Sequence, residues 1–130
     1  MKCLFAFLLL SALVLPAIAF AETDDLVRTC KTNPSVVAPC FSIRGRISAY
    51  NGAPSLRIWQ IGTSRILGII SVENEIIPEI LKGKVSFNQS VFANLEVCPF
   101  TKSRLGEMQI VCVESATDIQ VRSTITYRKR

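Results

Sequence analysis

The chain has 130 residues, and 15 Lys and Arg against 10 Asp and Glu give it a formal net charge of +5. This charge permits an anionic partner but is too small to indicate nucleic-acid binding by itself. Histidine is absent, which excludes Ser-His and Cys-His nucleophiles, a histidine general base and histidine metal sites. We therefore expect a protein that is not an enzyme. No cofactor is expected either, since Gly52, Gly62 and Gly68 lack the spacing of a phosphate loop.

The first 21 residues have the three parts of a cleavable secretory signal peptide. Lys2 gives a positive start, residues 4–18 are almost entirely apolar, and residues 19–21 form a small-x-small cleavage site. The apolar stretch of about 15 residues is shorter than the roughly 20 that span a bilayer. We therefore expect a periplasmic or secreted mature protein without a membrane span. Its net charge would be +4, since only Lys2 among the charged residues is removed.

Four cysteines follow the predicted cleavage site: Cys30, Cys40, Cys98 and Cys112. An even number of cysteines in a small exported chain predicts two disulfides. Among the possible pairings we favour Cys30–Cys40 with Cys98–Cys112, because each bond would close a short local loop. The alternative is a zinc site, but the spacing of these cysteines does not match the usual zinc-binding motifs.

The rest of the mature chain divides into three parts. Residues 22–39 contain two X-Pro breaks and are expected to be irregular, residues 40–127 to form one all-β domain, and residues 128–130 to be a basic tail. Apolar and polar side chains alternate along residues 41–50, which predicts a half-buried strand. The alternation separates an inner set, Phe41, Ile43, Gly45, Ile47 and Ala49, from an outer set, Ser42, Arg44, Arg46, Ser48 and Tyr50.

The length of the first loop decides the register of the first hairpin. A two-residue loop would set Arg46 opposite Arg57, a destabilising pair of like charges. A four-residue loop at residues 51–54 sets Arg46 opposite Trp59 instead. We therefore expect the four-residue loop, with a second strand at residues 55–61. Both registers keep the apolar side chains on one face.

The later elements are less regular. A third strand is expected at residues 65–72, with Gly68 as a bulge or bend, and a short helical segment after it. Strands at residues 91–98 and 108–113 follow, and alternation at residues 119–127 suggests a last one. The order predicts a small antiparallel barrel or curled sheet, such as an OB-type barrel with its helix between strands three and four. A small antiparallel sandwich would give much the same pattern.

Several blocks of this sequence resemble a family of small exported bacterial proteins without assigned function. The blocks read CFSIRGRISAYNGAPSLRIW, GTSRILGI, VCPF and MQIVCVESA, and they lie within residues 40–116. The resemblance implies a bacterial periplasmic or secreted setting. It implies no catalytic residues.

The most suggestive side chains lie on the first hairpin. The candidate ligand-binding residues are Arg44, Arg46, Tyr50, Arg57 and Trp59. Basic residues interleaved with aromatic rings bind anionic polymers or stack against bases and sugars, as in OB folds. The alternative is a solvated outer face, in which Arg46 shields Trp59 through a cation–π contact. We therefore hypothesise a non-enzymatic binding module whose partner is an anionic polymer, a glycan or a protein.

The sequence offers two alternatives to a binding module. The first is a secreted inhibitor whose loop at residues 99–107 enters the cleft of a target enzyme. The second is glycoside hydrolysis by paired carboxylates from Glu73, Glu75 and Glu79, although glutamates beside a short helix are more typical of a solvated surface. Salt dependence separates binding of a charged polymer, which weakens steeply with salt, from insertion of an apolar loop.

Overall fold

The computed structural model describes residues 29–70 and 77–124. The predicted signal peptide at residues 1–21, Glu73 and Glu75, and the basic tail at residues 128–130 lie outside the described residues. In chain order the elements are η1 (Cys30–Thr32), β1 (Phe41–Ala49), β2 (Leu56–Gln60), β3 (Ile66–Ile69), η2 (Glu79–Leu81), β4 (Gln89–Pro99) and β5 (Gln109–Ser123), where η marks a 3-10 turn.

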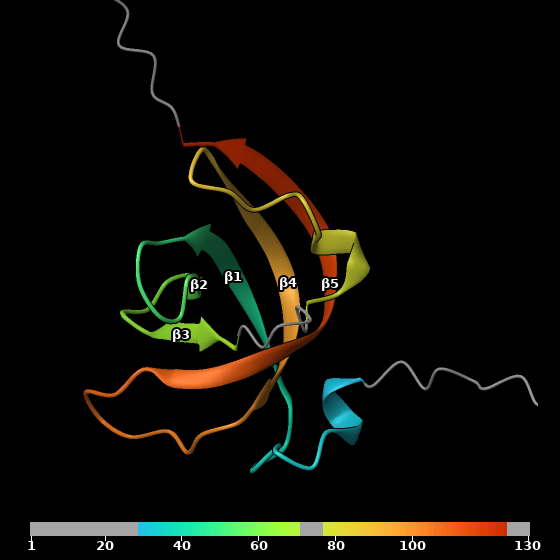
Figure 1. The fold of residues 1–130 in the computed structure, drawn as a ribbon, viewed down its shortest axis with the longest axis vertical. Helices are drawn as coiled ribbons and strands as arrows, with labels where there is room; N and C mark the ends of the chain where they lie inside the picture. Colours follow the sequence, from blue (N-terminus) through green and yellow to red (C-terminus); the bar gives the residue numbers. More distant parts are fainter. Residues whose placement is uncertain (1–28, 71–76, 125–130) are drawn as a thin grey trace, which may run out of the picture.

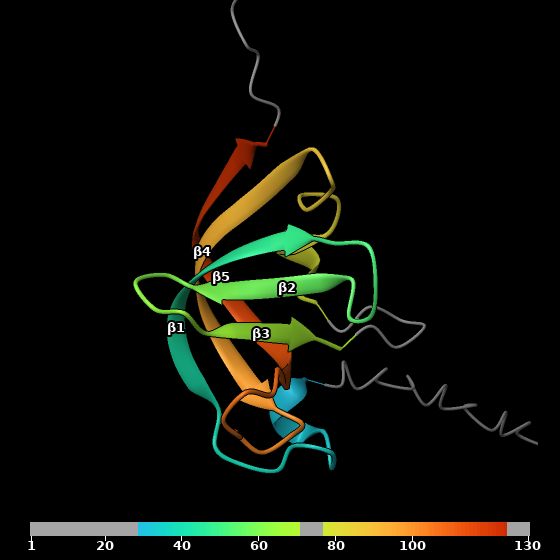
Figure 2. The same cartoon turned by 90° about the vertical axis from the view of Figure 1, so that its left-hand side faces the viewer.

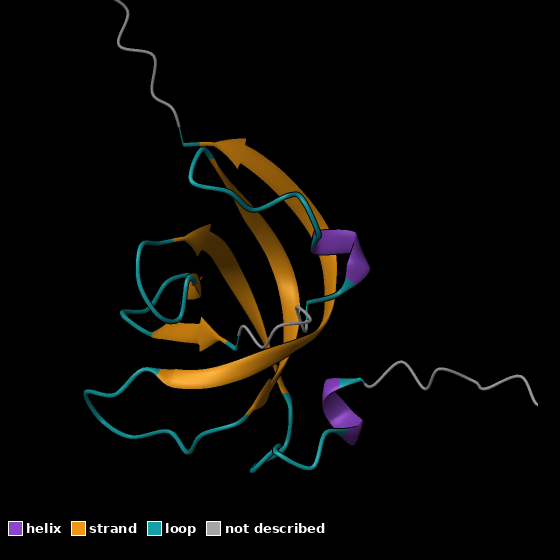
Figure 3. Cartoon of the chain, viewed as in Figure 1, coloured by secondary structure: helices purple, strands orange, loops and turns teal. Residues whose placement is uncertain are grey.

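The strands close into a barrel in the order β1-β2-β3-β5-β4 (Figure 1). The described helical structure consists of the two 3-10 turns, and η2 falls between β3 and β4 as expected (Figure 3). The all-β prediction is therefore confirmed, with the strand order of an OB-type barrel. One detail differs from a purely antiparallel barrel, because β3 and β5 run parallel. This pairing follows from the order of the strands, since β5 returns antiparallel to β4 and closes the ring against β3.

The first hairpin has the predicted register. Arg46 pairs with Trp59 and Ile47 pairs with Ile58. The backbone N–H of Tyr50 donates to the carbonyl oxygen of the residue after Pro54 at 2.7 Å, so the loop has the expected four residues. Figure 2 shows β1, β2 and β3 side by side in one wall of the barrel. Alternation along these strands therefore sends one set of side chains inward and the other outward.

The hydrophobic core fills the barrel. Its buried members are Ile43, Ile47, Ile58, Leu67, Ile69, Leu81, Val91, Ala93, Leu95, Val97, Val111, Val113 and Ala116. Burying each of the larger aliphatic side chains contributes roughly 1.5–3 kcal/mol. Packing is tight at Gly45, where an added Cβ would lie 2.6 Å from Ile58 and 3.0 Å from Leu95. The inner position of β1 at this point therefore has no room for a side chain.

Strand β5 differs from the prediction. Residues 108–113 and 119–127 were expected to form separate strands, but β5 is one strand of 15 residues. Its register against β4 shifts twice, between Phe92 and Asn94 and between Glu96 and Val97. Each shift inserts one extra residue into β5 and changes which of its positions face the core. The bulges therefore interrupt the alternation of apolar and polar residues in β5. Without that alternation, the sequence does not predict one continuous strand.

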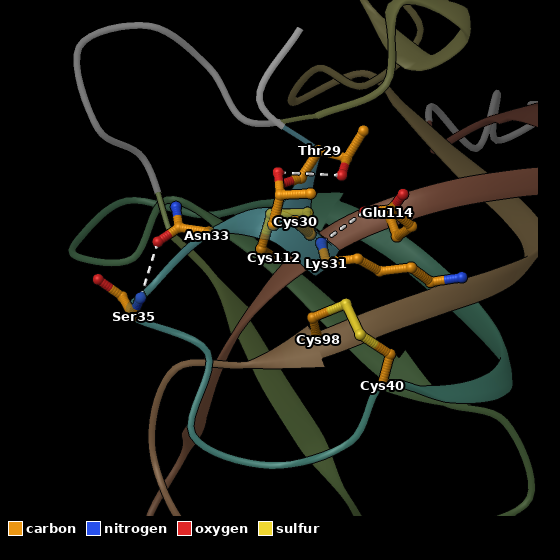
Figure 4. The surroundings of a disulfide bond; sticks show 10 residues. Thr29, Cys30, Lys31, Asn33, Ser35, Cys40, Cys98, Cys112 and Glu114 are labelled. Carbon is orange, nitrogen blue, oxygen red and sulfur yellow. Dashed lines mark hydrogen bonds between the residues drawn. A yellow bond between two sulfur atoms is a disulfide. The ribbon is translucent and has the colours of Figure 1, made fainter. Parts of the chain in front are cut away.

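The predicted disulfide pairing is wrong. Bonds join Cys30 to Cys112 and Cys40 to Cys98, in place of Cys30–Cys40 and Cys98–Cys112 (Figure 4). Cys98 and Cys112 lie opposite each other on β4 and β5, and both are fully buried. They lie on the outer side of the sheet, because their neighbours on each strand fill the core. The N-terminal segment crosses this outer surface and brings one cysteine to each of them.

The described part of the N-terminal segment is fixed to the barrel by further contacts. Val36 and Phe100 pack around the cysteines, and the backbone N–H of Val37 donates to the carbonyl oxygen of Pro99 at 2.9 Å. Residues 29–39 therefore form a cover over one end of the β4–β5 pair. We call this region the disulfide end.

Candidate functional site

Trp59 and Arg46 lie together on the outer surface of the barrel. The guanidinium carbon of Arg46 is 5.2 Å from the centroid of the Trp59 ring, as the predicted register requires. Trp59 is half-buried, and its indole N–H donates to the backbone oxygen of Thr63 at 2.7 Å. The ring is therefore fixed between the turn after β2 and the Arg46 side chain.

Arg57 and Tyr50 form a second pair beside the β1–β2 loop. The guanidinium carbon of Arg57 lies 4.9 Å from the centroid of the Tyr50 ring, and its Nε donates to the carbonyl oxygen of Pro54 at 3.2 Å. Arg57 thus holds the loop against the sheet. Its positive charge has no acidic partner in the described parts of the chain.

Arg44 differs from the other arginines of the hairpin. Its Nη1 forms an ion pair with Asp118 Oδ2 at 3.0 Å and donates to Asn94 Oδ1 at 3.3 Å. Asp118 has a positive φ of 50° and lies in the bulge of β5 opposite Phe92 and Asn94. The bulge therefore presents a carboxylate that neutralises Arg44, which removes this residue from the set of unpaired cations.

The structure adds two residues that our sequence reasoning missed. Strand β1 also pairs with β4, where Phe92 is the partner of Arg46. The guanidinium carbon of Arg122, on β5, lies 4.7 Å from the centroid of the Phe92 ring. The only sequence signal was Phe92 itself, a large ring at an outward position of a predicted strand. We define the arginine–aromatic face as the outward side chains Arg46, Tyr50, Arg57, Trp59, Phe92 and Arg122.

Arg46 occupies the centre of this face and has an unsatisfied donor. Its Nε is buried and has no hydrogen-bond partner within residues 29–70 and 77–124. Leaving a buried donor unsatisfied costs about 1–3 kcal/mol, and more for a charged group. Beside it, the hydroxyls of Ser48 and Ser90 are 2.9 Å apart. Because this Nε is shielded from solvent, an oxyanion on the face would contact the Nη groups of Arg46 instead.

Charges at the disulfide end are paired, in contrast to those of the face. Lys31 Nζ lies 2.8 Å from Glu96, and the backbone N–H of Lys31 donates to Glu114 at 3.0 Å. The hydrogen bond and negative charge of Glu96 raise the pKa of the Lys31 amino group, with a smaller contribution from Glu114.

The β4–β5 loop is the other prominent surface feature. Leu105 is fully exposed at its apex, in a turn that Glu107 closes by donating its N–H to the carbonyl oxygen of Arg104 at 3.2 Å. At the base of the loop, the N–H of Ile110 donates to Thr101 Oγ1 at 2.9 Å. The loop therefore presents one apolar side chain on an ordered stem.

Within the described ranges, no three His, Cys, Asp or Glu side chains gather as metal ligands would. No helix there is long and apolar enough to cross a membrane. One cavity of about 200 Å³ lies between the end of the barrel and η2, and Leu56, Ile69 and Leu81 are among its lining residues. This volume is below the roughly 300–1,000 Å³ of ordinary small-molecule sites.

No family model, curated protein or solved structure matches this chain. The resemblance to small exported bacterial proteins therefore stays a prediction.

Proposed function

We propose that this protein is a non-enzymatic binding module and that its arginine–aromatic face holds an anionic partner. One observation carries the proposal. Arg46 lies against the ring of Trp59, has no acidic partner among the described residues, and has Nη groups that are not among the buried unpartnered atoms. Guanidinium groups make short, strong hydrogen bonds to carboxylate, sulfate and phosphate oxygens. A guanidinium fixed in this way loses little side-chain entropy when an anion binds.

The surrounding charges support the same conclusion. The described ion pairs join Lys31 to Glu96, Arg44 to Asp118, and Lys82 to Glu79. None of them involves Arg46, Arg57 or Arg122. The face therefore concentrates unpaired positive charge on a protein whose overall charge is modest. Local concentration of this kind attracts anions more effectively than the net charge suggests.

The compartment proposed for this function is an exported one. Two disulfides, in which Cys30, Cys98 and Cys112 are buried, favour an oxidising environment. The predicted signal peptide agrees with that setting, and it makes extracytoplasmic polymers and proteins the accessible partners.

The β4–β5 loop favours a second candidate function, inhibition of a secreted enzyme. Leu105 is fully exposed at the apex of this loop, and Cys98 and Cys112 anchor the two strands beneath it. A rigid loop that presents one apolar side chain is suited to a cleft. The face remains the better supported site, because several independent contacts converge on it.

The test uses the fluorescence of Trp59, the one tryptophan of the chain, while the oxidised protein is titrated with heparin as a model polyanion. Because Arg46 would contact the anion directly, Arg46→Ala should weaken binding at least tenfold. The same change should reduce the slope of log Kd against log salt concentration by about one. Arg104→Ala removes the same charge from the exposed loop and serves as the matched control.

Three results would contradict the proposal. The first is an absence of heparin binding at low salt, and the second is an equal loss in the Arg46→Ala and Arg104→Ala variants, which would indicate unspecific attraction. The third is loss of binding in Leu105→Ala with none in Arg46→Ala, which would favour the loop instead.

A further inference from the structure

We propose, building on the function above, that the partner is an acidic polysaccharide chain that crosses the strands from Arg57 on β2 to Arg122 on β5. In this arrangement Trp59 and Phe92 act as positioning residues that hold the arginines. They do not act as platforms on which bases or sugar rings stack.

Both aromatic rings in this arrangement already have a guanidinium group against them. Trp59 has the guanidinium of Arg46 against it at 5.2 Å, and Phe92 has that of Arg122 at 4.7 Å. Proteins that bind single-stranded nucleic acid stack successive bases on open aromatic rings. Here guanidinium groups already occupy the rings, so the surface recognises charge.

The strand register arranges the outward side chains in two rows across four strands. One row across β2, β1, β4 and β5 consists of Trp59, Arg46, Phe92 and Gln120. The adjacent row consists of Arg57, Ser48, Ser90 and Arg122, in which the hydroxyls of Ser48 and Ser90 join β1 to β4. Neighbouring strands are about 4.8 Å apart, so the path of the second row over the curved barrel surface is about 14 Å from Arg57 to Arg122. One small anion cannot reach both ends of this row. A chain with repeated negative groups can.

The face also contains neutral polar groups that suit a sugar. Around the arginines lie the half-buried hydroxyl of Ser48 and the exposed amides of Asn94 and Gln120. Hydroxyl and amide groups of this kind hydrogen-bond to the hydroxyls of sugars. A surface that combines cations with such groups, and whose aromatic rings are occupied, suits an acidic glycan better than an oligonucleotide.

The main experiment follows Trp59 fluorescence while the oxidised protein is titrated with heparin fragments of increasing length. Affinity should rise with length and then level off once a fragment reaches both ends of the row. Arg122→Ala should lose at least fivefold in affinity for long fragments and little for the shortest. Arg46→Ala should lose affinity for all of them, and Arg104→Ala should behave as the wild type.

The outcomes separate this inference from the proposed function. If long fragments bind Arg122→Ala as well as wild type while Arg46→Ala is impaired, the face binds anions but no chain crosses to β5. If an oligothymidylate binds more tightly than an abasic oligonucleotide of equal charge, the rings stack bases and the inference is wrong. If no polyanion binds at all, the proposed function fails as well.

A second measurement tests the positioning role of Phe92. Phe92→Leu removes the ring and should reduce the affinity for long fragments as much as Arg122→Ala does. Because the two residues would act as one unit, combining both changes should cost no more than either alone. Phe92→Tyr keeps a ring and should restore binding. Fully additive losses would mean that Phe92 touches the ligand directly and would overturn this role, provided that urea unfolding finds each variant folded.

Discussion

Cys98 and Phe92 both point outward from β4, yet their surroundings differ. Cys98 is fully buried beneath the N-terminal segment, whereas Phe92 is half-buried beside the exposed side chain of Arg122. The same surface of the same strand is thus covered at one end and open at the other. The difference arises from a distant part of the chain. Residues 29–39 contact β4 and β5 near Cys98 and Cys112 and do not cover the part of β4 that carries Phe92.

The charges follow the same division. At the disulfide end Lys31 has Glu96 and Glu114 as partners, while on the arginine–aromatic face Arg46 and Arg122 have no acidic partner among the described residues. One end of this surface therefore uses its polar and sulfur groups for stability. We expect the other end to keep its cations available for binding.

The largest effect should come from removing a disulfide. The bond between Cys40 and Cys98 joins residues 58 positions apart, and the chain-entropy model gives such a bond about 4 kcal/mol. The double variant Cys40→Ala/Cys98→Ala should therefore lose several kcal/mol in urea unfolding. Its heparin affinity under folding conditions should stay unchanged. A loss below about 1 kcal/mol, or a clear loss of affinity, would break the distinction between the two ends.

The next effect concerns Gly68, whose outer side is covered by the β1–β2 loop. An added Cβ would collide with the ring of Pro54 and lie 2.9 Å from Ile110 Cδ1. Gly68→Ala should therefore destabilise the protein by about 1–3 kcal/mol, as overpacking does elsewhere. Adding Ile110→Val removes one of the colliding atoms and should restore part of this loss in urea unfolding, with Ile110→Val alone as the control. An unchanged stability in Gly68→Ala would mean that the loop is not packed on β3.

The smallest effect should come from Lys31. Its raised pKa means that Glu96 stabilises the protonated amino group in the folded protein. This contribution is present below the ordinary lysine pKa and is lost as the pH rises through the raised value. Lys31→Met should therefore lower the Tm slightly at neutral pH, because exposed ion pairs contribute little. The difference from wild type should shrink at strongly alkaline pH. A difference that grows with pH would contradict this account.

Sequence reasoning succeeded where the interactions are local. Alternation along residues 41–50 placed Ile47 inward and Arg46 outward, and the like-charge argument selected the loop that pairs Arg46 with Trp59. Both arguments need only the two strands of one hairpin. The central part of the candidate site was therefore predictable.

The rest of the site depends on contacts between distant segments. Phe92 joins Arg46 only because β1 pairs with β4, and Arg122 reaches Phe92 only after two bulges have shifted the register of β5. The predicted disulfide pairing was wrong for the same reason. Nearness in sequence favoured joining Cys98 to Cys112, whereas the fold places a cysteine of the N-terminal segment against each of them.

The position of β5 in the ring has a consequence for the order in which the protein is made. Cys30 bonds to Cys112, and β3 closes the barrel through residues 109–111. A nascent chain that has not yet reached residue 112 can therefore neither close the ring nor pair all its cysteines. Contacts between such distant residues also slow folding, because a long loop must be closed first. The native fold can thus be completed only after β5 has been synthesised.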